Sequence, residues 1–294
     1  MQTINLAAEA LKSNQWEIKS VSGLPLIQSP LLNRYAGDLV HAFTTRNGGN
    51  TKAPYESFNL GRHVQDDALK ADALHNRSIL CTALEADLRY LKVPGQVHSG
   101  NIVTISEKDS APELAKVDGV ATRLPDVPLL LHFADCVPVI IYEHKKKLLA
   151  IVHAGWRGTA QAIARNAVDL LCREFGGDPS AMVAAVGPAI GTCCYPTGDD
   201  VVQQLMLTLS PPENVKLEID DLDSLVKAGG DSEQPRPDLK AINAMQLLLA
   251  GVGEVDVCSF CTSCRPDIFY SHRQSGGITG RQGATAMIRS NAAN

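Results

Sequence analysis

Short apolar runs alternate with amphipathic stretches along the 294 residues, and this pattern predicts a mixture of strands and helices. The apolar runs have the length and the β-branched content of buried strands. Predicted strands cover residues 24–27, 39–45, 102–105, 134–142, 148–153, 182–186 and 255–258. Apolar positions at helical spacing predict helices over residues 66–81, 160–175, 199–209 and 239–249.

Polar and glycine residues mark the ends of these elements. Asp66 and Asp238 precede helical patterns as N-caps, and Gly176 follows one as a stop signal. Residues 210–237 are rich in Pro, Asp and Gly and are the most loop-like part of the chain, with a potential strand at 215–219. Residues 1–24 are expected to be peripheral. Since no repeat or sharp change of composition divides the chain, we predict one domain over residues 1–294, of the α+β class.

The pattern places a β-hairpin at the centre of the chain. Two apolar runs flank the polar tip at residues 143–147, which reads as a tight turn between antiparallel strands. A register centred between His144 and Lys145 pairs Cys136 with His153. Directly opposed residues point to one face with Cβ atoms about 4.5–5.5 Å apart. A thiolate and an imidazole at that separation can share one metal ion.

Three residues form a candidate metal-ligand set: His98, Cys136 and His153. Catalytic zinc takes three protein ligands and keeps a fourth position open for water, so this set is complete. Three alternatives stay open on the residues alone. In the first, the histidines are ordinary polar residues at strand ends and Cys136 is a buried apolar filler. In the second, Cys136 is the nucleophile and His153 the base of a cysteine hydrolase. In the third, the chain is a binding protein without chemistry.

The remaining cysteines give a weaker metal signal. Residues 258–264 contain overlapping Cys-x-x-Cys pairs, whereas a structural zinc site normally takes four ligands from two such pairs. We expect one buried cysteine with exposed neighbours there. The adjacent pair Cys193-Cys194 is expected to serve packing.

Composition narrows the class of protein. Hydrophobic residues make up 45 % and charged residues 20 %, as in ordinary globular proteins. The net charge of −5 and the lack of a basic stripe argue against nucleic-acid and anionic-membrane partners. The start at Met1 lacks a signal-peptide pattern, and no apolar run approaches the length of a membrane span. We therefore expect a cytoplasmic protein whose eight cysteines are reduced.

Five ordered motifs between residues 39 and 288 resemble the laccase-domain family, also called multicopper polyphenol oxidase and purine nucleoside phosphorylase. They are Ser-Phe-Asn-Leu-Gly at 57–61, Gln-Val-His at 96–98, Ala-Asp-Cys-Val-Pro at 134–138, His-Ala-Gly-Trp-Arg-Gly at 153–158, and Gly-Pro-Ala-Ile-Gly followed by Cys-Cys-Tyr between 187 and 195. The resemblance implies a single-domain α/β/β/α layered sandwich with mixed and antiparallel strands. It also implies zinc ligands at His98, Cys136 and His153, with copper as the alternative metal.

The resemblance implies two kinds of chemistry, and the residues favour one of them. A multicopper oxidase needs a type 1 copper and a trinuclear cluster, which use more histidines than the eight of this chain. We therefore expect phosphorolysis of adenosine, inosine, guanosine or methylthioadenosine, with deamination of adenosine to inosine. A copper-dependent polyphenol oxidase and the cysteine hydrolase remain the alternatives.

Residue chemistry then suggests roles around the metal set. Arg46, Arg157 and Arg273 are candidates for a phosphate pocket, because arginine pairs well with phosphate oxygens. Asn59 and His63 are candidates for hydrogen bonds to ribose or base. Known zinc deaminases use a glutamate as proton shuttle. Here the neighbour of Cys136 is Asp135, which we expect to act with Cys136 and His153 in catalysis.

Overall fold

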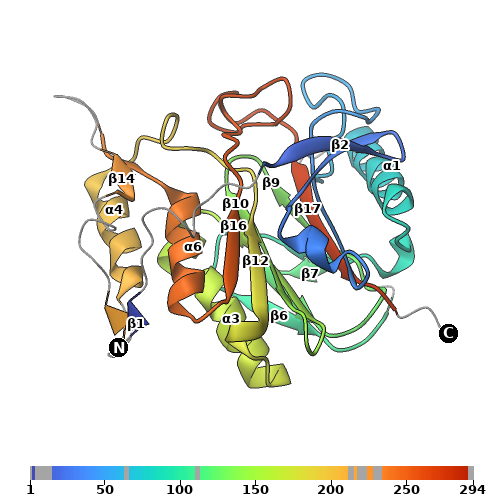
Figure 1. The fold of residues 1–294 in the computed structure, drawn as a ribbon. Helices are drawn as coiled ribbons and strands as arrows, with labels where there is room; N and C mark the ends of the chain where they lie inside the picture. The colour runs from blue at the N-terminus through green and yellow to red at the C-terminus, as the bar shows by residue number, and fades with distance from the viewer. Residues whose placement is uncertain are drawn as a thin grey trace.

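Two β-sheets packed face to face form the centre of the molecule, and helices cover both outer faces (Figure 1). The computed structural model describes residues 2–3, 15–62, 66–109, 113–210, 215–216, 224–227 and 234–290. The six-stranded sheet has the order β16 (Glu254–Val257), β12 (Met182–Val186), β10 (Val137–Glu143), β11 (Leu148–Ala154), β8 (Gly119–Thr122) and β6 (Ile102–Ile105). The five-stranded sheet has the order β2 (Glu17–Val21), β3 (Leu24–Gln28), β4 (Leu39–Thr44), β17 (Gln282–Ile288) and β9 (Leu129–Phe133).

Two-stranded sheets and helices accompany the two large sheets in the described residues. The paired strands are β1 (Gln2–Thr3) with β13 (Val215–Lys216), β5 (Val93–Gly95) with β7 (Glu113–Ala115), and β14 (Val226–Lys227) with β15 (Arg236–Pro237). The α-helices are α1 (Asp67–Ala83), α2 (Trp156–Ala160), α3 (Ile163–Phe175), α4 (Asp199–Met206) and α6 (Leu239–Leu249). Single 3-10 turns are η1 (Leu32–Tyr35), η2 (Leu88–Tyr90), η3 (Pro179–Ala181) and η4 (Leu207–Leu209).

Three apolar cores define the layers. One core lies between the sheets and contains Phe43 of β4 and Ile140 of β10. A second lies between the six-stranded sheet and helices α3 and α6, and a third between the five-stranded sheet and α1. The sheets are mixed and antiparallel, since β6–β8 and β12–β16 run parallel and the other pairs of the two large sheets run antiparallel. This confirms the predicted α/β/β/α sandwich.

Local capping signals set two of the helix starts as predicted. The Asp66 carboxylate accepts the Leu69 N–H at the start of α1, and the Asp238 carboxylate accepts two N–H groups at the start of α6. The helix predicted over residues 160–175 is instead two helices, α2 and α3. Ala162 between them has a left-handed backbone, with φ 53°, which interrupts the regular helix.

The N-terminal region is more integrated than expected where it is described. Strand β2 forms the edge of the five-stranded sheet. The buried Trp16 ring packs against Phe43, and its indole N–H donates to Asp256 at 2.8 Å. Of the potential strand at 215–219, Val215 and Lys216 form β13, while 217–219 lie outside the described residues.

The central hairpin exists, but its register is shifted by two residues from the prediction. Pro138 opposes His153, and Cys136 lies directly before β10. The turn closes later because Glu143 stays in the strand opposite Leu148, where its buried carboxylate accepts the Lys146 N–H at 2.6 Å. An even shift keeps every side chain on its face, so Cys136 and His153 remain diagonal neighbours on one face.

Strands β8 and β9 are not among the predicted strands. Strand β8 pairs with β11, and β9 pairs with β17. None of the helices within the described ranges combines the length and apolar character needed to cross a membrane.

Candidate metal centre

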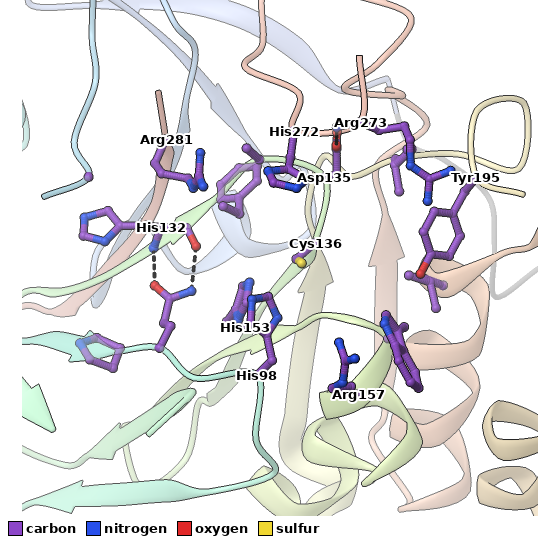
Figure 2. A pocket seen from close by; sticks show the side chains of 18 of the residues that line it. His98, His132, Asp135, Cys136, His153, Arg157, Tyr195, His272, Arg273 and Arg281 are labelled. Carbon is purple, nitrogen blue, oxygen red and sulfur yellow. Dashed lines mark hydrogen bonds between the residues drawn. The ribbon is translucent and has the colours of Figure 1, made fainter. Parts of the chain in front are cut away.

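Three side chains from separate parts of the chain meet beside the end of the hairpin. His98 lies in the loop between β5 and β6, Cys136 directly precedes β10, and His153 is in β11. The ligand atoms of these residues lie within 4.8 Å of one another. Figure 2 shows the Cys136 sulfur facing the two imidazole rings. The structure therefore brings the predicted ligand set together, including His98.

A buried carboxylate that the sequence analysis missed holds this group in place. Asp118 Oδ1 lies 2.9 Å from His153 Nδ1 and accepts the His98 backbone N–H at 3.0 Å. Its Oδ2 accepts N–H groups from Val97 and Ser99 and the Ser99 hydroxyl. Since Nδ1 is engaged, His153 presents Nε2 to a metal. A carboxylate behind a ligand histidine is a common arrangement in metal sites.

Gly155 supplies the space for the donors. It follows β11 directly, and an added Cβ would lie 2.8 Å from His98 Nδ1 and 3.0 Å from Cys136 Sγ. Its φ of −67° is accessible to any residue, so the constraint is the close approach of the two donors and not the backbone angle. The signal for Gly155 was the glycine within the His-Ala-Gly-Trp-Arg-Gly motif.

The donors sit where the chain passes from one sheet to the other. Residues 134–136 connect β9 of the five-stranded sheet to β10 of the six-stranded sheet. Asp135 makes the turn with φ 94°, a strained value for a side chain. Its carboxylate accepts the Thr262 hydroxyl at 2.6 Å and the Arg273 backbone N–H at 2.7 Å, which hold this conformation.

Electrostatics favour the deprotonated thiol. Burial alone would raise the pKa of Cys136, but the neighbouring His153 and His98 lower this pKa to about 6. Burial alone would lower the pKa of His153, but Cys136 and Asp118 raise it to about 9. The surroundings thus favour the thiolate form of Cys136 and the protonated form of His153. Metal binding at this site would release the proton of His153.

The same group lines a cavity of about 820 Å³, a typical size for a small-molecule site. Arg157 and Arg273, the candidate phosphate residues, line this cavity, and so does Asp135. Arg281 and His272, which had not been assigned to the site, line it as well (Figure 2). Two of the lining arginines lie over aromatic rings. The Arg157 guanidinium lies 4.3 Å from the centre of the Trp156 ring, and the Arg273 guanidinium lies 5.2 Å from the centre of the Tyr195 ring.

Two other predicted substrate residues, Arg46 and Asn59, do not line the cavity. Arg46 does not line the cavity, because its guanidinium donates to the carbonyls of Glu56 and Pro266 and lies over the Tyr270 ring. Asn59 is buried and bonds with its side chain to Gly61 and to the Arg281 backbone, so it supports the cavity wall from behind. We leave both out of the substrate site. His63 lies outside the described residues.

The donor set fits zinc. Two imidazole nitrogens and one thiolate are common zinc ligands, and three of them leave a coordination position toward the cavity. The residues that the structure describes contain one further group of three or more potential ligands, which is made of cysteines alone. Neither group provides the many imidazoles of a multicopper centre.

Comparison with known proteins identifies the family. A family profile described as multi-copper polyphenol oxidoreductase laccase matches residues 40–289. The chain belongs to this family. Among members of the laccase family, the purine nucleoside phosphorylase YlmD of Geobacillus stearothermophilus is 39 % identical over 251 residues, covering 82 % of this chain and 87 % of that protein.

Two further comparisons extend the laccase-family match. A protein named adenosine deaminase RL5, from an unknown prokaryotic organism, is 32 % identical over 252 residues, which cover 82 % of this chain and 91 % of that one. The crystal structure of YlmD from Geobacillus stearothermophilus superposes with a TM-score of 0.80 at 36 % identity, covering 90 % of this chain and 96 % of that chain. Both confirm the family resemblance of the motifs, and the second confirms the fold.

Gly155→Ala should reduce metal affinity at least about 10-fold with little change in thermal unfolding, because the added methyl displaces His98 and Cys136 and not the core. Competition titration with a chromophoric chelator measures the affinity. Gly37→Ala is the matched control, since a Cβ there meets nothing within 4 Å. Unchanged affinity in Gly155→Ala would contradict the site.

Asp118→Asn should weaken metal binding by about 10- to 100-fold, because it removes the carboxylate that orients His153 and the His98 loop. The same titration measures this loss. Asp267→Asn serves as the control, as it removes an exposed carboxylate whose described partner is Arg265. Equal metal affinity in the two variants would show that Asp118 has no part in the site.

Proposed function

We propose that this protein is a zinc-dependent purine nucleoside enzyme. It phosphorolyses adenosine, inosine, guanosine and methylthioadenosine, and it deaminates adenosine to inosine. The observation that carries the proposal is the shared cavity: His98, Cys136 and His153 line the same space as Arg157 and Arg273. The names of the relatives, purine nucleoside phosphorylase and adenosine deaminase, agree with both reactions.

The arginines suit the phosphate substrate. In phosphorolysis a phosphate oxygen bonds to ribose C1′ while the C1′–N9 bond breaks and the purine leaves. Guanidinium groups bind phosphate through charge-assisted hydrogen bonds and orient its attacking oxygen. Arg157 and Arg273 are each positioned over an aromatic ring, which limits the rotamers they adopt at the cavity. We assign phosphate binding to these two side chains.

The donor set suits deamination. Water adds at purine C6 and ammonia leaves. When held by the two histidines and Cys136, zinc supplies a Lewis acid that lowers the pKa of a bound water molecule. Asp135 stays our candidate for proton transfer beside Cys136. Each of its oxygens accepts one hydrogen bond within the protein, and each has a second lone pair for a substrate or water proton.

Two other functions compete with this proposal. A copper-dependent phenol oxidase would match the family description, but the chain has eight histidines in total, too few for a multicopper centre. A cysteine hydrolase would use the Cys136–His153 pair with Asp118 as the orienting group. His98 favours the metal, because a thiol mechanism has no need of a third donor within 4.8 Å.

Purified protein incubated with adenosine and phosphate should yield inosine, adenine and hypoxanthine by liquid chromatography. Cys136→Ala should lower both activities at least about 100-fold while circular dichroism stays unchanged, because one of three metal ligands is lost. Cys172→Ala is the control, as that thiol lies on α3 away from the cavity. Full activity of Cys136→Ala, or copper-dependent phenol oxidation without purine products, would overturn the proposal. Inactivation of metal-free, active protein by iodoacetamide would instead favour the hydrolase.

Arg157→Gln and Arg273→Gln should each raise the KM for phosphate by about 10- to 100-fold, the loss expected for a charged hydrogen bond. Deamination of adenosine uses no phosphate, so its rate should change far less in the same variants. Steady-state kinetics of both reactions measures the difference. Arg173→Gln, an exposed position on α3, is the control. Parallel losses in the two reactions would contradict phosphate binding by these arginines.

A further inference from the structure

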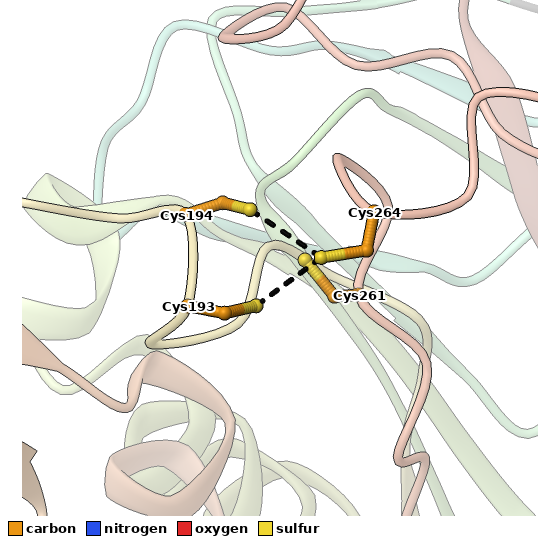
Figure 3. A group of neighbouring side chains, drawn as sticks. All are labelled: Cys193, Cys194, Cys261 and Cys264. Carbon is orange, nitrogen blue, oxygen red and sulfur yellow. Dashed lines mark hydrogen bonds between the residues drawn. The ribbon is translucent and has the colours of Figure 1, made fainter.

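Four cysteines gather into a second cluster, separate from the His98–Cys136–His153 set. Cys193 and Cys194 lie in the segment after β12, and Cys261 and Cys264 lie in the segment after β16. Their four sulfur atoms lie within 4.8 Å of one another (Figure 3). As expected, one cysteine of the segment is buried, Cys258, and Cys264 is exposed; the grouping with Cys193 and Cys194 was not expected. The two motifs are about seventy residues apart in sequence, and only the pairing of β12 with β16 brings them together.

Backbone contacts hold the two segments in register. Ala189 and Cys261 form a parallel bridge, and the Thr262 N–H donates to the Ala189 carbonyl at 3.1 Å. The Gly191 N–H donates to Cys261 Sγ at 3.2 Å. Hydrogen bonds of this kind stabilise thiolate ligands and orient them. The pairing of β12 with β16 and these hydrogen bonds thus fix the positions of the two cysteine-bearing loops relative to each other.

The sulfur spacing fits one tetrahedral ion and does not fit a disulfide. Cys264 Sγ lies 3.4 Å from both Cys193 Sγ and Cys194 Sγ, while a disulfide bond measures about 2.05 Å. Around an ion with Zn–S bonds of about 2.3 Å, the sulfur atoms of a tetrahedron lie roughly 3.8 Å apart. The distances in the cluster, from 3.4 Å up to the limit of 4.8 Å, bracket that value.

We propose that Cys193, Cys194, Cys261 and Cys264 together bind one structural zinc ion. Four thiolates close the coordination shell, so no position remains for water or substrate. Tetrahedral sulfur sites select zinc or iron, and the close spacing leaves no room for the several irons of an iron–sulfur cluster. Arg236 donates to the Cys193 carbonyl at 2.8 Å and places positive charge beside the four thiolates.

Zinc here would stabilise one wall of the cavity described above. Tyr195, directly after Cys194, lines the cavity, as does Ile190. Thr262, directly after Cys261, holds the Asp135 carboxylate at 2.6 Å. The ion would therefore connect the two segments that position Tyr195 and Asp135, without contacting the substrate.

Metal analysis of the full chain tests the proposal. Purified protein loaded with zinc and desalted should contain two zinc ions per chain by mass spectrometry. The Cys261→Ser/Cys264→Ser double variant should keep one, Cys136→Ala should keep one, and Cys172→Ser should keep two. Loss of the structural ion should also lower the thermal midpoint, whereas loss of the other ion should not do so to the same degree.

Cys136→Ala alone keeps the test valid if the double variant fails to fold. Its remaining zinc should show four sulfur neighbours at about 2.3 Å by X-ray absorption. Cobalt in its place should give intense thiolate charge-transfer bands. Zinc-free Cys136→Ala, a mixed nitrogen–sulfur shell, iron absorption, or a mass lower by two hydrogens from a disulfide would each overturn the proposal. Because these readouts measure metal and not turnover, failure of the purine activity leaves them unaffected.

Discussion

The carboxylate of Asp118 connects His98 and His153, two of the three donors of the candidate metal centre. It is fully buried directly before β8, and it accepts four hydrogen bonds from the His98 loop while it contacts His153 Nδ1 on β11. Isolated burial of such a charge would be costly, and these partners offset that cost. Since the loop has no sheet partners at His98, whose φ is 60°, Asp118 is what relates this donor to the hairpin.

The passage of the chain between sheets creates the space for chemistry. Strands β9 and β10 belong to different layers, so residues 134–136 must turn sharply at the edge where the layers separate. Asp135 adopts its strained backbone there because Thr262 and Arg273 hold its carboxylate. The turn places Cys136 in the lining of a cavity that Arg157, Arg273 and Arg281 also line. A strained turn stabilised from outside is typical of functional sites.

The two groups of potential metal ligands differ in their coordination geometry. His98, Cys136 and His153 leave a coordination position open toward the cavity, while the four-cysteine cluster is closed. Both depend on the six-stranded sheet: the first on the β10–β11 hairpin, the second on the parallel β12–β16 pair. Thr262 connects them, since it follows Cys261 and holds Asp135 beside Cys136. In our proposals the open site performs the chemistry, and the closed one stabilises the cavity wall.

Features that depend on neighbours in sequence could be predicted from the chain alone. The caps at Asp66 and Asp238 act on N–H groups two or three residues away, and the two hairpin strands follow from apolar runs around one polar tip. Side chains alternate between the two faces of a strand, so the sequence also placed Cys136 and His153 on one face. The observed hairpin register differs from the predicted one by two residues, because Glu143 stays in the strand and accepts the Lys146 N–H. The motifs indicated the family and the three donors.

The places of Asp118, Arg281 and the four-cysteine cluster were decided by tertiary structure, as was the exclusion of Arg46 and Asn59 from the cavity. Their partners lie tens to hundreds of residues away, and only the packing of two sheets determines which of those distant groups meet.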